Sequence, residues 1–247
     1  MSQSSAARKV RLVYISHMVT PHQVRYCNAL QNHIDAEFWF YESAAETRGS
    51  WWDVDLGKKC FVLDTIIGTG TGRLSAKYVA RGIVDRLNKF NPDVVMLGGF
   101  SVPSNYVAYR WALKRGKKTI VFTERSRDSS GNLRRRGVVW SLIRYLYRKL
   151  DVVMVSADDI RDQFKNEFRF GDKVVVGRYP SDLDSYFEHK PRVAKSGYTY
   201  IFPNRLIDIY NPLGAIEVFA LIYKRYPSSK LLMNAVGPLR DECELFV

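Results

Sequence analysis

Residues 198–244 read YTYIFPNRLIDIYNPLGAIEVFALIYKRYPSSKLLMNAVGPLRDECE, and the order of their strand and helix signals decides the fold. Residues 198–202 form a short apolar run rich in β-formers. Residues 211–225 have the composition of a helix, and residues 230–233 form a second apolar run that a Gly237-Pro238 turn follows. This order predicts a βαβ unit, with two parallel strands joined by a helix. Because a parallel sheet is covered on both faces, we expect this unit to be the front of a larger module.

The same alternation runs through the preceding part of the chain. Apolar runs predict strands at residues 10–16, 36–41, 59–64, 94–97, 118–122, 151–156 and 173–177. Helical patterns separate them at residues 21–33, 68–90, 103–115, 135–150 and 157–168. We therefore expect an α/β fold, a doubly wound parallel-sheet, Rossmann-like N-terminal domain at residues 1–188. The polar stretch from residue 188 to 197 is the expected linker, and residues 189–247 begin a second, incomplete Rossmann-like domain.

Of the 247 residues, 46% are hydrophobic and 26% are charged, which is the composition of a globular protein with a buried core. Cys27, Cys60 and Cys243 are odd in number and lack the spacing of metal ligands. They predict free thiols in a reducing compartment and no metal site. No stretch has the length and apolarity of a signal peptide or a membrane span, so the sequence predicts a cytoplasmic protein.

The net charge of +13 indicates acidic partners. Residues 125–149 carry eight basic residues against one acid, with aromatic residues between them. On a helix they suit an anionic membrane surface, and a solvated basic face on a core helix is the alternative. The expected membrane-contacting residues are Arg134, Arg135, Arg136, Trp140, Arg144 and Arg148. Nucleic-acid binding would rest on charge alone, since no recognised module is present, and we expect none.

Ligands of parallel α/β sheets bind beyond the carboxyl ends of the strands. The side chains and glycines that follow predicted strands are His17, Thr20, Gly98, Gly99, Ser101, Glu124, Asn204, Arg205 and Gly237. Arg205 suits a diphosphate, because a guanidinium pairs with two oxygens, although a plain surface arginine remains the alternative. Glu124 would orient a hydroxyl or act as a base, unless it only forms a solvated ion pair. Gly98-Gly99 allows close approach of a ligand, or is simply a tight turn.

Several of these segments together resemble one enzyme family. They are N91PDVV95, D151VVMVS156, a reduced turn that keeps Pro180, Asp184 and Phe187, N204RL206, and G237PLR240. In this order they resemble the group 1 family of glycosyltransferases, whose GT-B architecture has two facing Rossmann-like domains. The resemblance covers nearly the whole chain.

The resemblance implies retaining transfer of a sugar from a nucleotide sugar, without a cofactor or an obligatory metal. Arg205, with Asn204 and Gly237, would bind the donor. The N-terminal domain would hold a saccharide or lipid-linked acceptor near His17, Thr20, Gly98, Gly99 and Ser101, with Glu124 as the catalytic residue. Together with the basic helix, this suggests cell-envelope polysaccharide synthesis by a peripheral protein on the inner face of the cell membrane.

The sequence also departs from the family pattern. The family's second diphosphate cation, a lysine, is replaced by Tyr210, and Ala235 stands for the first glycine of the Gly-x-Gly-Pro turn. The acidic residues that hold the donor sugar would lie beyond Val247. We therefore expect a truncated donor domain that is inactive by itself. The alternative is a non-catalytic membrane- or partner-binding protein that keeps the glycosyltransferase fold.

Overall fold

The computed structural model divides the chain into two compact units, residues Met1–Leu183 (unit 1) and Asp184–Val247 (unit 2). The described residues are 8–43, 54–67, 78–100, 102–123, 138–166, 169–177, 187–188, 197–234 and 236–247. Each unit is described by itself.

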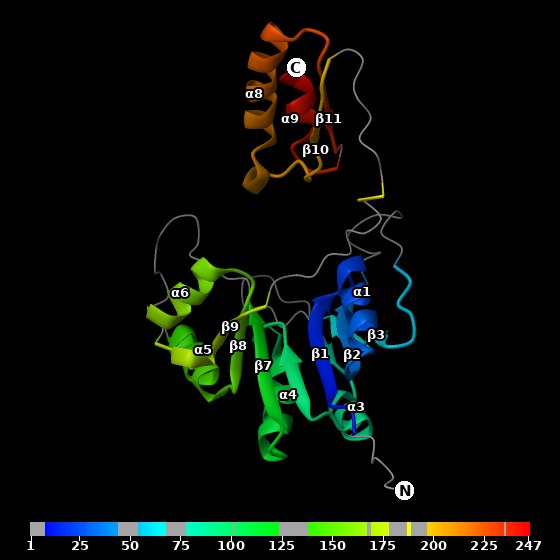
Figure 1. Cartoon of the computed structure of the whole chain (residues 1–247), viewed down its shortest axis with the longest axis vertical. Helices are drawn as coiled ribbons and strands as arrows, with labels where there is room; N and C mark the ends of the chain where they lie inside the picture. The colour runs from blue at the N-terminus through cyan, green and yellow to red at the C-terminus, as the bar shows by residue number, and fades with distance from the viewer. Residues whose placement is uncertain are drawn as a thin grey trace, which may run out of the picture. The chain divides into compact units, whose positions relative to one another are not determined.

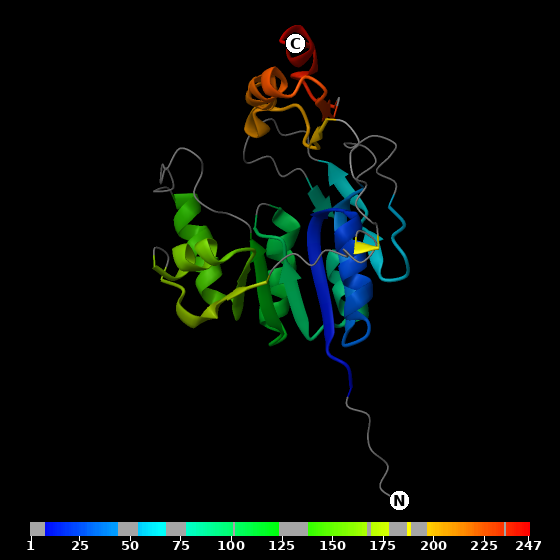
Figure 2. The same cartoon turned by 45° about the horizontal axis from the view of Figure 1, so that its top comes forward.

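Unit 1 is built on a seven-stranded sheet in the order β3-β2-β1-β6-β7-β8-β9, with every neighbouring pair parallel (Figures 1 and 2). Its strands are β1 (Arg11–Met18), β2 (Asp35–Glu42), β3 (Cys60–Val62), β6 (Val94–Leu97), β7 (Lys118–Thr123), β8 (Val152–Val155) and β9 (Val174–Val176). The order runs outward from β1 in one direction and from β6 in the other. This is the strand order of a Rossmann fold with a further strand at one edge.

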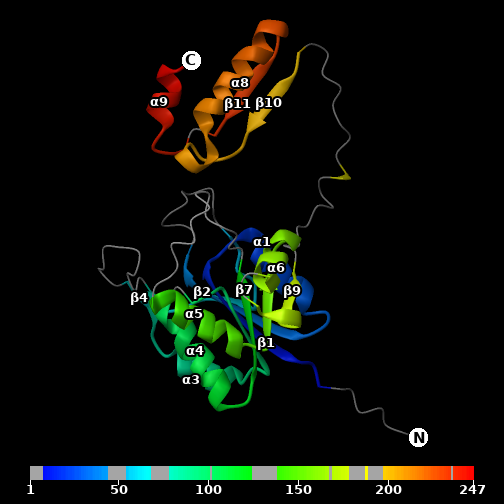
Figure 3. The same cartoon turned by 90° about the vertical axis from the view of Figure 1, so that its left-hand side faces the viewer.

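Helices cover both faces of this sheet (Figure 3). They are α1 (Pro21–Leu30), α3 (Ile83–Phe90), α4 (Pro103–Lys114), α5 (Val138–Lys149) and α6 (Asp158–Asn166), with a 3-10 turn η1 (Gly171–Lys173) before β9. Alternate residues of β1 point to opposite faces: Val13 and Ile15 pack in the core with α3 to α6, and Tyr14 packs in the core with α1. Burial on both faces explains why the sequence of β1 is a continuous apolar run.

One predicted element is wrong. The apolar spacing predicted a single helix over residues 68–90, but α3 begins only at Ile83. Before it, β5 (Tyr78–Ala80) pairs antiparallel with β4 (Thr65–Ile67), with Val79 opposite Ile66. Gly82, at φ +62°, holds the left-handed conformation that separates strand from helix. The glycine run at 68–72 lies outside the described residues.

Unit 2 contains the predicted βαβ unit. Its elements are β10 (Thr199–Phe202), a 3-10 turn η2 (Asp208–Tyr210), α8 (Pro212–Arg225), β11 (Lys230–Met233) and α9 (Arg240–Leu245). β10 and β11 are parallel, with Ile201 opposite Leu232 (Figure 3). Leu206, Ile216 and Cys243 form the buried core between this pair and the helices.

The expected fold class, an α/β fold with a doubly wound parallel sheet, is confirmed. The expected first-domain boundary at residue 188 and the incompleteness of the second domain stay predictions. Cys27, Cys60 and Cys243 are free and buried, as the spacing indicated.

Candidate functional site

The order of the strands places the first candidate site at the carboxyl ends of β1 and β6. These two strands are neighbours, with Ile15 opposite Leu97, and helices leave them toward opposite faces. The Gly98 N–H donates to the carbonyl oxygen of Ile15 at 2.9 Å. A Cβ on Gly98 would lie 3.5 Å from Ser16. The predicted residues Gly98 and Gly99 therefore lie beside the end of β1, at the point where such sheets bind ligands.

Thr20 lies at the same edge, but the fold uses its hydroxyl. It is the N-cap of α1: its Oγ1 accepts from the Gln23 N–H at 3.4 Å and donates to Gln23 Oε1 at 2.9 Å. Gln23 Nε2 in turn donates to Ser16 Oγ at 3.1 Å. This chain ties the first turn of α1 to the end of β1. Thr20 therefore has a structural role at this edge as the N-cap of α1, whether or not it also contacts a ligand.

His17 and Glu42 form a second contact at this edge. His17 belongs to β1, not to the loop after it, and its Nε2 lies 3.5 Å from Glu42 Oε2 at the end of β2. The side chain of His17 is 53% exposed and that of Glu42 is 11% exposed. The sequence did not single out Glu42, because the pairing of β1 with β2 alone brings it to His17.

His22 lies in the first turn of α1, with its Nε2 3.4 Å from Thr20 Oγ1. Burial lowers the pKa of His22, which favours the neutral imidazole. A neutral ring in hydrogen-bonding contact with the cap suits a structural role for His22 at the start of α1.

The start of α4 completes this edge with buried polar groups that the sequence analysis missed. Ser104 and Asn105 are each 2% exposed. Ser104 Oγ accepts from the Ala80 N–H of the β4–β5 hairpin at 2.8 Å. Asn105 binds the Gly99 carbonyl and the Tyr41 hydroxyl. In the sequence, the available signal was two polar residues directly after the proline that starts the helix. Two of their partners, Tyr41 and Ala80, lie 64 and 24 residues away, so the pattern could not reveal these bonds.

Other predicted residues lie outside the described part of the chain or only partly within it. Ser101, Glu124, Arg134, Arg135 and Arg136 lie outside it, and so do the side chains of Trp140 and Arg144. Arg148 is exposed in the last turn of α5, just before β8 begins, and so lies at the opposite edge from His17 and Gly98. Beside it, Tyr145 is 57% exposed, and Lys149 Nζ lies 5.6 Å from its ring centroid.

The second candidate site lies at the carboxyl ends of β10 and β11, in unit 2. Asn204 and Arg205 follow β10 and are exposed. Among the described residues, no hydrogen bond or ion pair engages the Arg205 side chain. Directly after it, Leu206 is buried; its N–H donates to the Val236 carbonyl at 2.8 Å, and its carbonyl accepts from the Leu239 N–H at 3.1 Å. These bonds join the loop after β10 to the turn after β11.

Gly237 is part of that turn, and its lack of a side chain is required. It has φ +150°, and a Cβ at this position would collide with the carbonyl oxygen of Leu206 and lie 2.6 Å from its carbonyl carbon. The structure thus brings together Asn204, Arg205 and Gly237, the three residues expected to bind the donor. Only a glycine allows the two loops to approach so closely.

Helix α8 begins at the same edge of unit 2. Asn211, at φ +48°, is its N-cap, and Asn211 Oδ1 accepts from the Gly214 N–H at 3.2 Å. Tyr210, directly before it, is 42% exposed and provides no charge. Arg205 is therefore the cation that the loop after β10 presents, and Ala235 lies outside the described residues.

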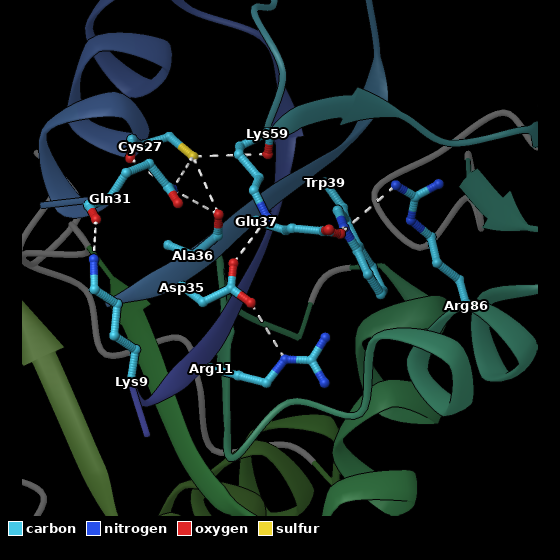
Figure 4. Close-up of polar contacts among 10 residues, drawn as sticks. All are labelled: Lys9, Arg11, Cys27, Gln31, Asp35, Ala36, Glu37, Trp39, Lys59 and Arg86. Atoms are coloured by element: carbon cyan, nitrogen blue, oxygen red, sulfur yellow. Dashed lines mark hydrogen bonds and ion pairs between the residues drawn. The ribbon is translucent and has the colours of Figure 1, made fainter. Parts of the chain in front are cut away.

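The opposite edge of unit 1 holds a network of charges with a structural role (Figure 4). Asp35, at the start of β2, accepts from Lys59 Nζ at 2.8 Å and pairs with Arg11 Nε at 3.3 Å. The hydrogen bond from Lys59 holds the pKa of Asp35 below its ordinary value.

The described residues contain no group of three or more His, Cys, Asp or Glu side chains placed to hold a metal ion. None of the helices in the described part is long and apolar enough to cross a membrane.

Comparisons with known proteins agree on the fold. No family model matches this chain, and no curated protein matches it by sequence. UDP-N-acetylglucosamine 2-epimerase from Neisseria meningitidis, bound to UDP-GlcNAc, matches it with a TM-score of 0.55 and 14% identity, over 96% of this chain and 69% of that protein. The UDP-N-acetylglucosamine 2-epimerase from Rickettsia bellii matches with a TM-score of 0.52 and 13% identity, over 96% of this chain and 64% of that protein. The glycotransferase of kitacinnamycin matches with a TM-score of 0.50 and 10% identity, over 94% of this chain and 67% of that protein.

The chain spans about two thirds of the length of these proteins. At such low identity the likeness establishes only a shared fold, the Rossmann-like α/β fold that the matched epimerases and glycotransferase also have.

Proposed function

We propose that this chain belongs to a glycosyltransferase that moves a sugar from a nucleotide sugar to a saccharide or lipid-linked acceptor, as the resemblance to the group 1 family implies. That the chain is inactive by itself stays a prediction, which the incubation described below tests. The observation that carries the proposal is Arg205, exposed at the end of β10 and held beside the Gly237 turn. Its guanidinium would pair with the donor diphosphate in a bidentate manner.

Catalysis would then rest mainly on electrostatic stabilisation of the departing diphosphate. In the retaining reaction the acceptor hydroxyl attacks on the face that the diphosphate leaves, so the charge of Arg205 acts where charge develops. The start of α8 at the same edge adds the positive end of a helix dipole. The acceptor would bind in unit 1 near His17, Thr20, Gly98, Gly99 and Ser101, with Glu124 taking its proton. That no cofactor takes part stays a prediction.

The test is binding of UDP-GlcNAc, measured by titration calorimetry on the whole chain. UDP-GlcNAc is the first probe because a protein of the same fold binds it. R205A should weaken binding by about 10- to 100-fold, as expected for loss of a hydrogen bond to a charged group. K224A is the matched control: Lys224 is an exposed cation in the last turn of α8, at the other end of the helix. Equal losses in the two variants, or a wild type that binds no nucleotide sugar, would contradict the proposal.

Incubation of the chain with UDP-GlcNAc and with octyl glucoside as the acceptor separates two enzyme classes that share this fold. A transferase releases UDP and gives a glycosylated acceptor. An epimerase leaves the nucleotide intact and inverts one centre of the sugar, which nuclear magnetic resonance detects directly. An epimerised nucleotide sugar without transfer would replace the proposed activity.

Tyr210 is the observation that favours the second candidate, a non-catalytic protein that retains the fold. It stands where the family has a cation and is an uncharged, exposed side chain. Firm binding to vesicles together with no affinity for any nucleotide would support this candidate over the enzyme.

We further propose that the protein acts in cell-envelope polysaccharide synthesis, at the inner face of the cell membrane, through its basic segment. Exposed Tyr145, Arg148 and Lys149 at the end of α5 support this. Sedimentation with phosphatidylglycerol vesicles, and not with phosphatidylcholine vesicles, is the expected result. Equal sedimentation with both, or with neither, would contradict it.

A further inference from the structure

The buried side chain of Asn105 bridges the Gly98-Gly99 turn and Tyr41. Asn105, in the first turn of α4, donates from Nδ2 to the Gly99 carbonyl oxygen at 2.7 Å. Its Oδ1 accepts from the Tyr41 hydroxyl at 2.6 Å. Tyr41 is 1% exposed and Asn105 is 2% exposed, so both bonds are shielded from water.

The bridge connects three strand ends with one helix. Tyr41 belongs to the end of β2, and Gly98 hydrogen-bonds to Ile15 at the end of β1. Gly99 follows β6, and Asn105 belongs to α4. Of these strands, β1 and β6 are the two between which the carboxyl-edge crevice of a Rossmann-like sheet forms. The orientation of the Gly98-Gly99 turn thus depends on one amide side chain.

The backbone of Gly99 has a conformation that favours glycine. Its φ is +95°, and a Cβ built on it would meet nothing within 4 Å. On its far side Phe100 is anchored, with its ring 5.4 Å from that of Tyr109 and 5.8 Å from that of Tyr147. Because the peptide is planar and trans, a Gly99 carbonyl that points to Asn105 turns the Phe100 N–H the opposite way.

We infer that Asn105 is a positioning residue for acceptor binding, which acts by fixing the Gly99–Phe100 peptide in the orientation that the acceptor meets. The inference rests on the proposed function for the existence of an acceptor. Asparagine suits the role because one amide group provides an acceptor for the Tyr41 hydroxyl and a donor for the Gly99 carbonyl.

Two nearly isosteric variants separate positioning from stability. N105D keeps an acceptor for Tyr41, but its ionised carboxylate has no donor for the Gly99 carbonyl, which removes the hold on the turn. Because a buried carboxylate also costs stability, binding to each variant is compared at the same folded fraction. Y41F keeps the Asn105 bond to Gly99 and leaves Oδ1 without its donor, which costs stability but leaves the turn held.

The experiment uses the whole chain with two probes and one structural readout. Octyl glucoside, below its micelle concentration, stands for a lipid-linked saccharide acceptor, and UDP reports the donor site. Hydrogen exchange, followed by mass spectrometry, reports the amides of residues 98–100. N105D should speed exchange there and weaken octyl glucoside binding about tenfold, while the UDP affinity stays within about twofold of wild type. Y41F should lower the Tm yet keep the octyl glucoside affinity within about threefold.

Wild-type affinity for octyl glucoside in N105D would overturn the inference. So would equal losses of affinity in N105D and Y41F that follow their loss of Tm, because the role would then be structural only. A wild type that binds octyl glucoside but not UDP, or any nucleotide sugar, overturns the proposed donor function and leaves the Asn105 comparison valid. A wild type that binds no octyl glucoside overturns the acceptor role itself.

Discussion

Gly237 packs directly against the backbone of Leu206, so closely that a Cβ at Gly237 would overlap the Leu206 carbonyl group. The two residues belong to the loops that follow the two parallel strands of unit 2. Hydrogen bonds of Leu206 to Val236 and Leu239 hold these loops together. This contact sets the position of Arg205, one residue before Leu206.

G237A should destabilise unit 2 by about 1–3 kcal/mol, because alanine is strained at φ +150° and also meets the Leu206 backbone. Hydrogen exchange of the amides at 204–207 and 236–239 should rise, and UDP-GlcNAc affinity should fall with it. G171A is the control, since Gly171 has φ +62° but nothing within 4 Å of a Cβ. If both variants lose the same stability, the close contact with Leu206 carries no energy of its own.

T20A should lower the stability of unit 1 by about 1 kcal/mol, because the N-cap of α1 loses its hydroxyl. T20S keeps the hydroxyl and should stay close to wild type. Chemical denaturation measures both. If T20A is as stable as wild type, the hydroxyl is available for a ligand contact and the cap is unimportant.

Asp35 should make the stability of unit 1 sensitive to acid. Its pKa is lowered in the folded state, chiefly by the hydrogen bond from Lys59, so its contribution is present above its ordinary value of 3.8. It is lost as the pH falls through the lower folded pKa. D35N should therefore be less stable than wild type at pH about 6, and the difference should shrink as the pH falls below the ordinary pKa of 3.8.

Denaturant titrations at several pH values measure this effect of D35N. D172N, which alters an exposed carboxylate, is the control. If the free energy of unfolding of D35N differs from that of wild type by the same amount at every pH, Asp35 does not cause the acid sensitivity.

R86M should destabilise unit 1 by about 1–3 kcal/mol. The Arg86 guanidinium lies 3.8 Å from Glu37 Oε2 and 4.8 Å from the ring centroid of Trp39 (Figure 4). It also lies 4.2 Å from the ring centroid of Phe61. Methionine keeps part of the packing but leaves the Glu37 carboxylate without its cation. R81A, at an exposed arginine nearby, should stay within about 0.5 kcal/mol of wild type in thermal and denaturant unfolding. If R86M is as stable as wild type, the stacked guanidinium of Arg86 contributes nothing to the stability of unit 1.

Much of the fold could be predicted because its signals are local. The continuous apolar run that became β1 and the proline-led starts of α1, α4 and α8 depend on a few neighbouring residues. The β4–β5 hairpin could not be read in this way. Val79 fits a helical spacing equally well, and only its pairing with Ile66 makes it part of a strand.

The candidate sites show the same division. The sequence by itself determined that Arg205 follows a strand, that Gly98 and Gly99 follow another, and that strands and helices alternate. Only the tertiary structure decided that Gly237 must touch Leu206, that Glu42 meets His17, and that Asn105 links Tyr41 to Gly99. The reason is physical. Propensity and periodicity depend on residues close together in the chain, whereas these contacts join strand ends that only the order and register of the sheets bring together.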